Sequence, residues 1–203
     1  DGGFTGPVLP VSPRHKAVCG VLAYPDIASL PLTPDLAILC THARHTPTLL
    51  QQLGERGCRA VIVLSGHAAD HEQLHQLAQQ YRLRLLGPNS LGILAPWQGL
   101  NASFSPVSAR PGKLAFVSQS TAVATTVLDW AAPRQIGFSH FIALGDGLDV
   151  DVDDLLDYLA SDSKTSAILL YLEQLTDARR FLSAARAAAR NKPILVVKSG
   201  RSA

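Results

Sequence analysis

The sequence predicts an α/β fold with two Rossmann- or flavodoxin-like parallel-sheet domains, truncated at both ends. Short runs rich in Val, Ile and Leu alternate along the chain with segments of helical periodicity. Runs that are apolar throughout and separated by helices are typical of parallel strands covered on both faces. The composition agrees with a globular protein, because 47% of the 203 residues are hydrophobic and 17% are charged.

The predicted strands are the apolar runs, most of which are separated by a helix-length segment. They cover residues 6–11, 35–41, 58–65, 83–88, 113–119, 138–145, 166–173 and 192–200. The predicted helices cover residues 46–56, 69–81, 121–132, 151–161 and 176–190. The last helix has a capping Thr176 or Asp177 at its start, Ala and Leu opposite Arg along its length, and Pro193 beyond its end.

Residues 95–112 contain closely spaced Pro, Gly and Ser without periodicity, so we place a domain boundary there. The two predicted domains are 1–98 and 110–203. The first residues resemble the tail of a helix that leads into a second strand, which implies that a first strand and its phosphate-binding turn are missing. The chain also stops directly after a strand, so we expect a fragment of a longer protein.

Charge and cysteine content exclude several classes of partner. The formal net charge of +2 is too small and dispersed to predict a nucleic-acid or membrane surface. Three widely spaced cysteines fit reduced thiols in a cytoplasmic protein better than a metal clip or a disulfide framework. No run approaches the roughly 20 apolar residues of a membrane span, and the common hydrolase, P-loop and kinase motifs are absent.

The segment VSQSTAVA places small polar residues where a predicted strand passes into a helix. Ligands collect beyond the carboxyl ends of parallel strands, where the first amides of the next helix carry partial positive charge. Ser118, Gln119 and Ser120 are therefore candidates for binding a phosphoryl group. The alternative is that Ser118 or Ser120 only caps the helix.

Two other patterns have a plainer explanation than metal binding. Asp149, Asp151 and Asp153 alternate as in a calcium loop, but the sixth and twelfth loop positions lack the Gly and Glu that such a loop needs. We interpret them as acidic residues at a helix start. His67, His71 and His75 would line one face of a helix, which we interpret as a solvated face. We predict no metal site.

Glu173 closes an apolar run at the carboxyl end of a predicted buried strand. An unpaired carboxylate is costly there, so we expect a hydrogen-bond partner for it. That partner is either a backbone turn or a catalytic group.

The order of several motifs resembles the nucleoside-diphosphate-forming acyl-CoA synthetases, relatives of the succinyl-CoA synthetase alpha subunit. The resemblance lies in PVSP (10–13), RLLGPNSLGILAP (84–96), LNASF (100–104), GKLAFVSQS (112–120), IGFSHFIALGD (136–146), AILLYLE (167–173) and KPILVVKSGRS (192–202). Residues 94–107 and 162–181 look most like the enterobacterial protein lysine acetyltransferases of the Pat type. The resemblance implies a CoA-binding Rossmann-like domain over 1–98 and a succinyl-CoA synthetase-like flavodoxin domain over 110–203.

The resemblance also implies a set of ligand contacts. Coenzyme A or acetyl-CoA would be the ligand, and ATP or ADP would bind elsewhere in the longer protein. The residues that match contact positions of the family are Arg14, Lys16, Thr41, His42, Ser65, Gly66, Asn89 and Ser90. Ser118 and Ser120 match serines at a helix start that receives a phosphohistidine, and Glu173 matches the carboxylate that orients this histidine. The histidine itself would follow Ala203.

Three functions follow as expectations. The first is a regulatory acyl-CoA-binding part of a cytoplasmic protein lysine acetyltransferase, inactive alone, with ATP-grasp-like and GNAT domains downstream. The second is part of a working acyl-CoA synthetase, an acid–thiol ligase that uses the downstream histidine. The third is a plain nucleotide-binding or assembly domain. The partner is a small-molecule acyl-CoA in the first two, and a homo-oligomer is left open.

Overall fold

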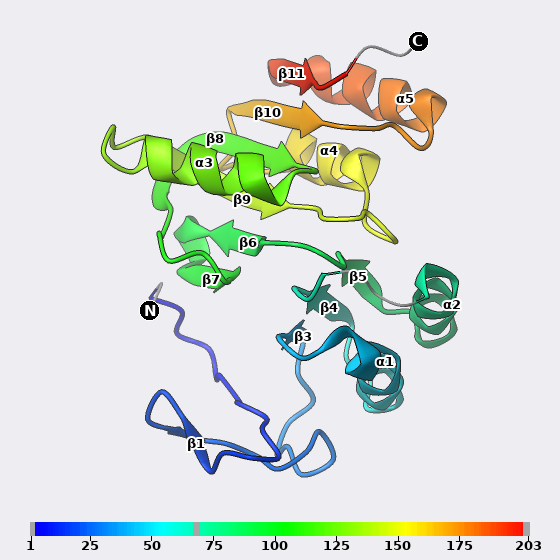
Figure 1. Cartoon of the computed structure of the whole chain (residues 1–203). Coiled ribbons are helices and arrows are strands. Elements are labelled where there is room, and N and C mark those ends of the chain that lie inside the picture. The colour runs from blue at the N-terminus through cyan, green and yellow to red at the C-terminus, as the bar shows by residue number, and fades with distance from the viewer. Residues whose placement is uncertain (1–2, 67–69, 201–203) are drawn as a thin grey trace.

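The computed structural model describes residues 3–66 and 70–200 and contains two main sheets (Figure 1). The smaller sheet has the order β3–β4–β5 and is parallel, formed by Leu36–Leu39, Ala60–Val63 and Arg84–Leu86. Helices α1 (Thr46–Glu55) and α2 (His71–Tyr81) connect these strands. The predicted parallel α/β architecture is confirmed here.

The larger sheet has six strands in the order β11–β10–β8–β9–β6–β7. Its parallel strands are β8 (Arg110–Ser118), β9 (Gly137–Ala143), β10 (Ala167–Leu172) and β11 (Ile194–Lys198). Helices α3 (Thr121–Ala131), α4 (Val152–Ser161) and α5 (Ala178–Ala189) connect them. The helices therefore lie within two residues of their predicted bounds.

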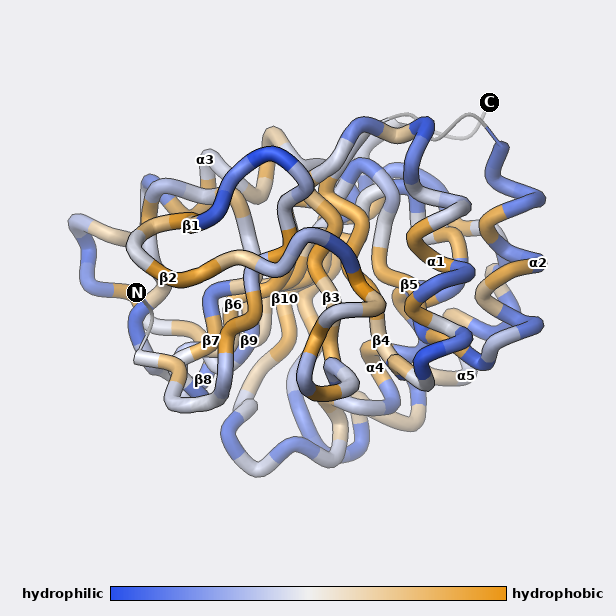
Figure 2. Tube along the Cα trace, turned by 90° about the horizontal axis from the view of Figure 1, so that it is seen from below, coloured by the Kyte–Doolittle hydropathy of each residue, from blue (hydrophilic) through white to orange (hydrophobic). Residues whose placement is uncertain are grey.

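The larger sheet is the middle of three layers. Leu128 of α3 packs with Phe116 and Phe141 on one face, and Leu156 of α4 packs with Val117 on the other. Helix α5 lies beside α4 on that second face (Figure 1). Apolar segments run through the interior while polar residues alternate along the outer helices (Figure 2). Both faces of β8 and β9 are covered, which explains their apolar runs. The edge strand β11 differs, because Leu195, Val196 and Val197 are exposed.

Local capping residues explain why the helices begin where they do. Asp70 accepts a hydrogen bond from the backbone of α2, and Ser120 does the same for α3. Asp151 and Asp154 form a capping box at the start of α4, while Asp177 accepts from two amides of α5. These side chains satisfy backbone donors that have no partner inside the helix.

The backbone before β3 differs from the prediction in two ways. Residues 6–11 form no strand; Val11 makes only an isolated bridge to Tyr24, and the prolines at 7 and 10 lack the donors that a ladder needs. A short antiparallel hairpin follows, made of β1 (Ala17–Val18) and β2 (Val21–Leu22).

The expected boundary segment, 95–112, carries regular structure. A hairpin of β6 (Gly92–Ala95) and β7 (Leu100–Ser103) pairs antiparallel with β9 and so extends the larger sheet. The segment is therefore not without periodicity, because residues 100–103 alternate apolar and polar side chains. This run of four is too short to stand out among the surrounding Pro, Gly and Ser. The division into domains at 98 and 110 remains a prediction.

One loop of the larger sheet holds the smaller sheet in place. The amides of Asp146 and Val150 donate to the carbonyls of Pro88 and Leu85, at 2.9 and 3.1 Å. The carboxylate of Asp149 accepts from the Leu85 amide at 2.8 Å. Residues 146–150 therefore run along β5 almost as an added strand, so the carboxyl ends of both sheets meet.

Candidate functional site

A pocket opens at the carboxyl ends of β3 and β4. Its volume is about 250 Å³, and it is lined mainly by apolar atoms of Cys40, Leu64, Ser65 and Phe104. Cys40 follows β3 and Ser65 follows β4, whereas Phe104 follows β7 of the other sheet. The pocket thus lies where a parallel sheet commonly binds ligands, and both sheets contribute to it.

Ser65 is the polar residue of the pocket with an unused group. Its hydroxyl oxygen is buried and has no hydrogen-bond partner among the described residues. The carbonyl of the same residue accepts from the amide of Asn89 at 2.9 Å, which fixes the turn. A buried hydroxyl without a partner is costly. The Ser65 oxygen has almost no accessible surface, so a ligand would reach it only after a rotation of the side chain.

The other predicted residues of this edge form its exposed rim. Thr41 and His42 follow Cys40 and are exposed; the His42 ring accepts from the Arg44 amide at 3.4 Å, at the start of a short 3₁₀ turn. Gly66 is exposed, and a Cβ atom on it would lie 3.4 Å from the side-chain oxygen of Asn89. The structure therefore brings Ser65, Gly66 and Asn89 together.

The turn after β5 depends on a glycine. Gly87 has φ +99°, and a Cβ atom there would lie 2.5 Å from the carbonyl oxygen of Val63. This close approach places Asn89 beside the end of β4. Ser90 was predicted at a ligand-contact position, but it is fully buried. Its hydroxyl donates to the Ala143 carbonyl and accepts from the Gly92 amide at 2.8 Å. Its hydroxyl is occupied inside the protein rather than offered to a ligand.

Arg14 and Lys16 are exposed and make no side-chain hydrogen bond or ion pair with the described residues. The backbone around Arg14 is held by Ser12, whose hydroxyl oxygen accepts from the amides of residues 14 and 15 at 3.4 and 3.1 Å. Neither basic residue lines the pocket. Their contact with a diphosphate remains a prediction.

The predicted phosphate site at the start of α3 is used largely by the protein itself. Ser118 is fully buried, and its hydroxyl donates to the Ser120 carbonyl at 2.8 Å and accepts from the Ser120 amide at 3.1 Å. Ser120 caps α3 through the amide of Val123. The Ser118 hydroxyl is therefore engaged within its own turn, and Ser120 caps α3 as the alternative states. Phosphate binding by Ser118, Gln119 and Ser120 remains a prediction.

Gln119 joins this helix start to the end of β10. Its side-chain oxygen accepts from the amides of Glu173 and Gln174, at 2.7 and 3.0 Å, and its own amide donates to the Tyr171 carbonyl at 3.1 Å. The side-chain NH₂ group must then face away from these two amides. Glu173 itself is exposed, so the expectation that burial requires a partner for its carboxylate is wrong.

The two predicted sites also touch each other. The hydroxyl of Thr121, the first residue of α3, donates to the carbonyl of Asn89 at 3.1 Å. On the other side of Asn89, its side-chain NH₂ donates to Asp146 at 3.3 Å. The start of α3 and the edge of the pocket are consequently parts of one region.

The histidines along α2 do not gather around a common point. His67 lies outside the described residues; His71 pairs with Asp146 at 3.2 Å, and His75 bonds Gln79 one turn further along the helix. Within 3–66 and 70–200, no three His, Cys, Asp or Glu side chains could together hold a metal ion.

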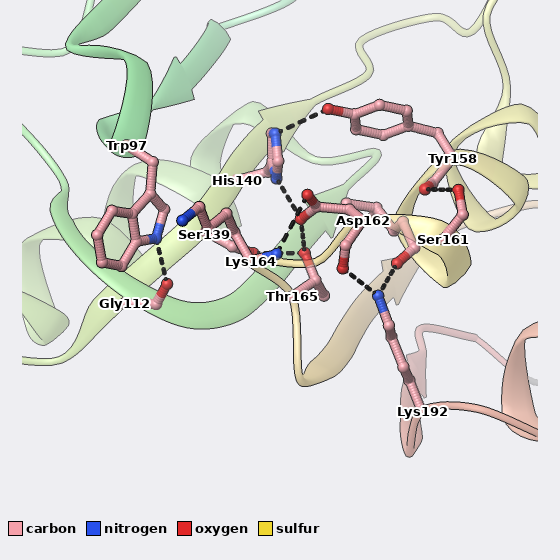
Figure 3. A network of polar contacts seen from close by, with 11 residues as sticks. Trp97, Gly112, Ser139, His140, Tyr158, Ser161, Asp162, Lys164, Thr165 and Lys192 are labelled. Atoms are coloured by element: carbon pink, nitrogen blue, oxygen red, sulfur yellow. Dashed lines mark hydrogen bonds and ion pairs between the residues drawn. The ribbon is translucent and has the colours of Figure 1, made fainter.

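A buried polar network that the sequence did not indicate lies on the α4 side of the larger sheet (Figure 3). Nε2 of His140 lies 3.3 Å from the Tyr158 hydroxyl oxygen, and Nδ1 lies 3.6 Å from the Asp162 carboxylate. Thr165 donates to that carboxylate at 2.5 Å and bonds Ser139 at 2.8 Å. Burial lowers the pKa of His140, and the charge of Asp162 offsets this only in part.

Three pocket residues were missed by the sequence interpretation, namely Cys40, Leu64 and Phe104. Cys40 and Leu64 directly precede predicted contact residues, and Phe104 ends the LNASF motif, so their positions were available as a signal. Their residue types alone indicate no particular chemistry, which is why the sequence interpretation missed them.

No helix in the described part of the chain has both the length and the apolar character needed to cross a membrane.

Family models match both halves of the chain. A model described as "CoA binding domain" matches residues 4–96, and one described as "Succinyl-CoA ligase like flavodoxin domain" matches residues 111–203. The pocket lining at Cys40, Leu64 and Ser65 falls within the first match, and Phe104 lies between the two.

Several curated and solved proteins are similar over nearly the whole chain. The ADP-forming acetate–CoA ligase I of Archaeoglobus fulgidus is 34% identical over 98% of this chain and 30% of its own length. The alpha subunit of the ADP-forming acetate–CoA ligase I of Pyrococcus furiosus is 32% identical over 98% of this chain and 46% of its own length. The chain thus spans less than half of these relatives.

A solved structure extends the comparison to the fold. The dinucleotide-forming acetyl-coenzyme A synthetase 1 of Candidatus Korarchaeum cryptofilum, in complex with phosphate and ADP, superposes with a TM-score of 0.93. It is 31% identical over 99% of this chain and 45% of that chain.

Proposed function

The chain belongs to the succinyl-CoA ligase-like, CoA-binding family, and from this premise we propose that it is the CoA-binding part of an ADP-forming acyl-CoA ligase. In this proposal, its longer protein joins a carboxylic acid to the thiol of CoA and converts ATP to ADP and phosphate. The relatives named above are CoA ligases, which supports this function over the expected regulation of an acetyltransferase. A small carboxylic acid such as acetate is the proposed acyl substrate.

The pocket at the ends of β3 and β4 is the observation that carries the proposal. It combines apolar walls with Ser65, whose buried hydroxyl has no partner within residues 3–66 and 70–200. A CoA molecule has apolar methylene and methyl groups beside amides and a base that can accept a hydrogen bond. Leu64 and Phe104 would contact the apolar parts, and the Ser65 hydroxyl would donate to a polar atom.

The start of α3 supports a second element of the proposal, the placement of the reacting groups. Thr121 and Ala122 head the helix, and their amides have no acceptor inside it. Gln119 holds the turn at Glu173 beside this helix start through two hydrogen bonds. We propose that backbone amides, rather than the Ser118 hydroxyl, stabilise negative charge here during the reaction.

Binding of CoA to this chain is the direct test. Isothermal titration of the chain with CoA is expected to give saturable heat, and acetyl-CoA is expected to bind as well. Ser65→Ala should weaken binding by about three- to tenfold, the value of one hydrogen bond to a neutral group. Phe104→Ala should also weaken binding, because Phe104 is 57% exposed in the free protein and would be covered by the ligand.

A serine at the amino end of a strand in the larger sheet provides the control. Ser166 is exposed, precedes β10 and makes no side-chain hydrogen bond with the described residues. Ser166→Ala should bind CoA as the unaltered chain does. Absence of saturable binding at millimolar CoA would contradict the proposal, and so would equal weakening by Ser65→Ala and Ser166→Ala.

A further inference from the structure

Asp146 lies between two polar side chains at the junction of the two sheets. One oxygen of its carboxylate accepts from the side-chain NH₂ of Asn89 at 3.3 Å, and the other lies 3.2 Å from Nε2 of His71. The amide of Asp146 also donates to the Pro88 carbonyl at 2.9 Å. Asp146 follows β9 of the larger sheet, so its carboxylate reaches across to the turn after β5 and to the start of α2.

The main chain of Asn89 is fixed from two directions. Its amide donates to the Ser65 carbonyl at 2.9 Å, and its carbonyl accepts from the Thr121 hydroxyl at 3.1 Å. Its φ of +60° is left-handed, a conformation that Asn adopts more readily than most residues. The freedom that remains lies in the side chain, and Asp146 restricts it.

The charge of Asp146 determines which end of the Asn89 side-chain amide faces away from it. A carboxylate can only accept hydrogen bonds, so the NH₂ end must face Asp146 and Oδ1 must point elsewhere. A Cβ atom on Gly66 would lie 3.4 Å from this Oδ1. Gly66 directly follows the pocket residue Ser65, and both Gly66 and Asn89 are exposed. The oxygen of Asn89 therefore lies beside the pocket where a ligand can meet it.

We propose that Asp146 is a positioning residue that presents the Asn89 side-chain oxygen as a hydrogen-bond acceptor at the rim of the pocket. This inference rests on the proposed function, because CoA is the ligand that the oxygen would meet. CoA carries N–H donors in its pantetheine arm and in the amino group of its adenine, and one of them donates to Asn89. Because His71 and the Pro88 carbonyl hold Asp146, the acceptor is oriented before the ligand arrives, which lowers the cost of binding.

Reversing the charge at position 146 tests this orientation. Isothermal titration with CoA should show an affinity lower by about tenfold for Asp146→Lys, because an ammonium group attracts Oδ1 and turns the NH₂ end toward the ligand. Asp146→Asn keeps an oxygen acceptor for Asn89 and should stay within about threefold of the unaltered chain. Asp129→Lys, on the exposed side of α3, makes the same change of charge and is the matched control. Because CoA is an anion, a general effect of added positive charge would raise its affinity rather than lower it.

Three further measurements separate orientation from a merely structural effect. In the Asn89→Ala background, Asp146→Lys should lower the affinity no further, because the amide that it would turn is gone. In nuclear magnetic resonance spectra of the free chain, Asp146→Lys should shift the side-chain NH₂ signals of Asn89, and Asp129→Lys should leave them in place. Titration with phosphopantetheine and with adenosine bisphosphate, the two halves of CoA, identifies the donor as the half that Asp146→Lys weakens.

The outcomes distinguish failure of this inference from failure of the proposed function. If the unaltered chain binds CoA and Asp146→Lys binds it equally well, the positioning role is refuted and the proposed function stands. The same conclusion follows if Asp146→Lys weakens binding by the same factor with and without the Asn89 side chain. If the unaltered chain binds no CoA, both proposals are refuted.

Discussion

The hydroxyl of Thr121 donates a hydrogen bond to the main-chain carbonyl of Asn89 at 3.1 Å. This contact joins the first residue of α3, on the larger sheet, to the turn after β5 of the smaller sheet. Together with the 146–150 loop along β5, it brings the two candidate sites into one region.

Loss of this hydroxyl should loosen the junction between the sheets. Thr121→Val keeps the size of the side chain but removes the donor, so the free energy of unfolding should fall by about 1 kcal/mol. Urea denaturation followed by circular dichroism measures the change. Thr126→Val is the matched control, because the Thr126 hydroxyl is exposed and bonds only within α3. Equal effects of the two substitutions would show that the Asn89 contact contributes nothing.

Gln119 should protect the amides at the end of β10 from exchange with solvent. Gln119→Leu removes the acceptor of the Glu173 and Gln174 amides, so their hydrogen exchange should accelerate by about tenfold or more. Gln119→Glu retains an oxygen acceptor and should keep most of the protection. Mass spectrometry of the peptide that contains residues 173–174 gives the rates; unchanged exchange in Gln119→Leu would contradict the role of the side chain.

Stability should fall as pH decreases through the titration range of histidine. Burial lowers the pKa of His140 below its ordinary value of 6.5, so the unfolded chain takes up this proton more readily than the folded one. The contribution of neutral His140 to the free energy of unfolding is therefore fully present above pH 6.5. It is lost as the pH falls through the lower pKa of the folded state. The groups that face the ring are Tyr158 and Asp162.

Denaturation between about pH 8 and pH 5 tests this effect. His140→Gln should be less stable at high pH but should lose less stability across the range. His45→Gln, at an exposed position, should keep the pH dependence of the unaltered chain. The Asp162 carboxylate contributes stability that is lost at lower pH. Burial acts to raise the pKa of its carboxyl, but hydrogen bonds from Thr165 and Lys164, with the nearby charges, lower this pKa overall. A pH dependence that survives His140→Gln unchanged would refute the assignment.

Lys192 should stabilise the end of α4. Its ammonium group donates to the carbonyls of Leu159, at 2.6 Å, and Asp162 (Figure 3). A cation near the carboxyl end of a helix satisfies free carbonyls and the helix dipole, so Lys192→Met should lower the free energy of unfolding by about 1–2 kcal/mol. Lys164→Met removes an exposed lysine that lies over the Trp97 ring and should cost less. Thermal unfolding of both variants measures the difference.

The helices and most of the parallel strands could be predicted from the sequence because their signals are local. Asp70, Asp151 and Asp177 each bond an amide one to three residues away, so residue type and spacing reveal the helix starts. The family was also accessible, because its motifs occur in a fixed order along the chain.

The role of each site residue was less accessible, since it depends on which groups already have partners. Ser118 and Ser120 look alike in the sequence, yet one is buried in a local turn and the other caps α3. Glu173 follows an apolar strand but lies at its exposed end. Gln119 and Glu173 are 54 residues apart, and their contact follows from strand pairing.

The α/β class, the helix starts and the family could be inferred from the sequence alone, because they depend on residue periodicity, on caps a few residues away and on motif order. The position of the pocket could not, because it depends on how segments far apart in the chain pack together. Phe104 reaches Cys40 and Ser65 only because the β6–β7 hairpin pairs with β9 and the 146–150 loop runs along β5. Such contacts join residues dozens of positions apart, so packing of the two sheets creates them and no local pattern encodes them.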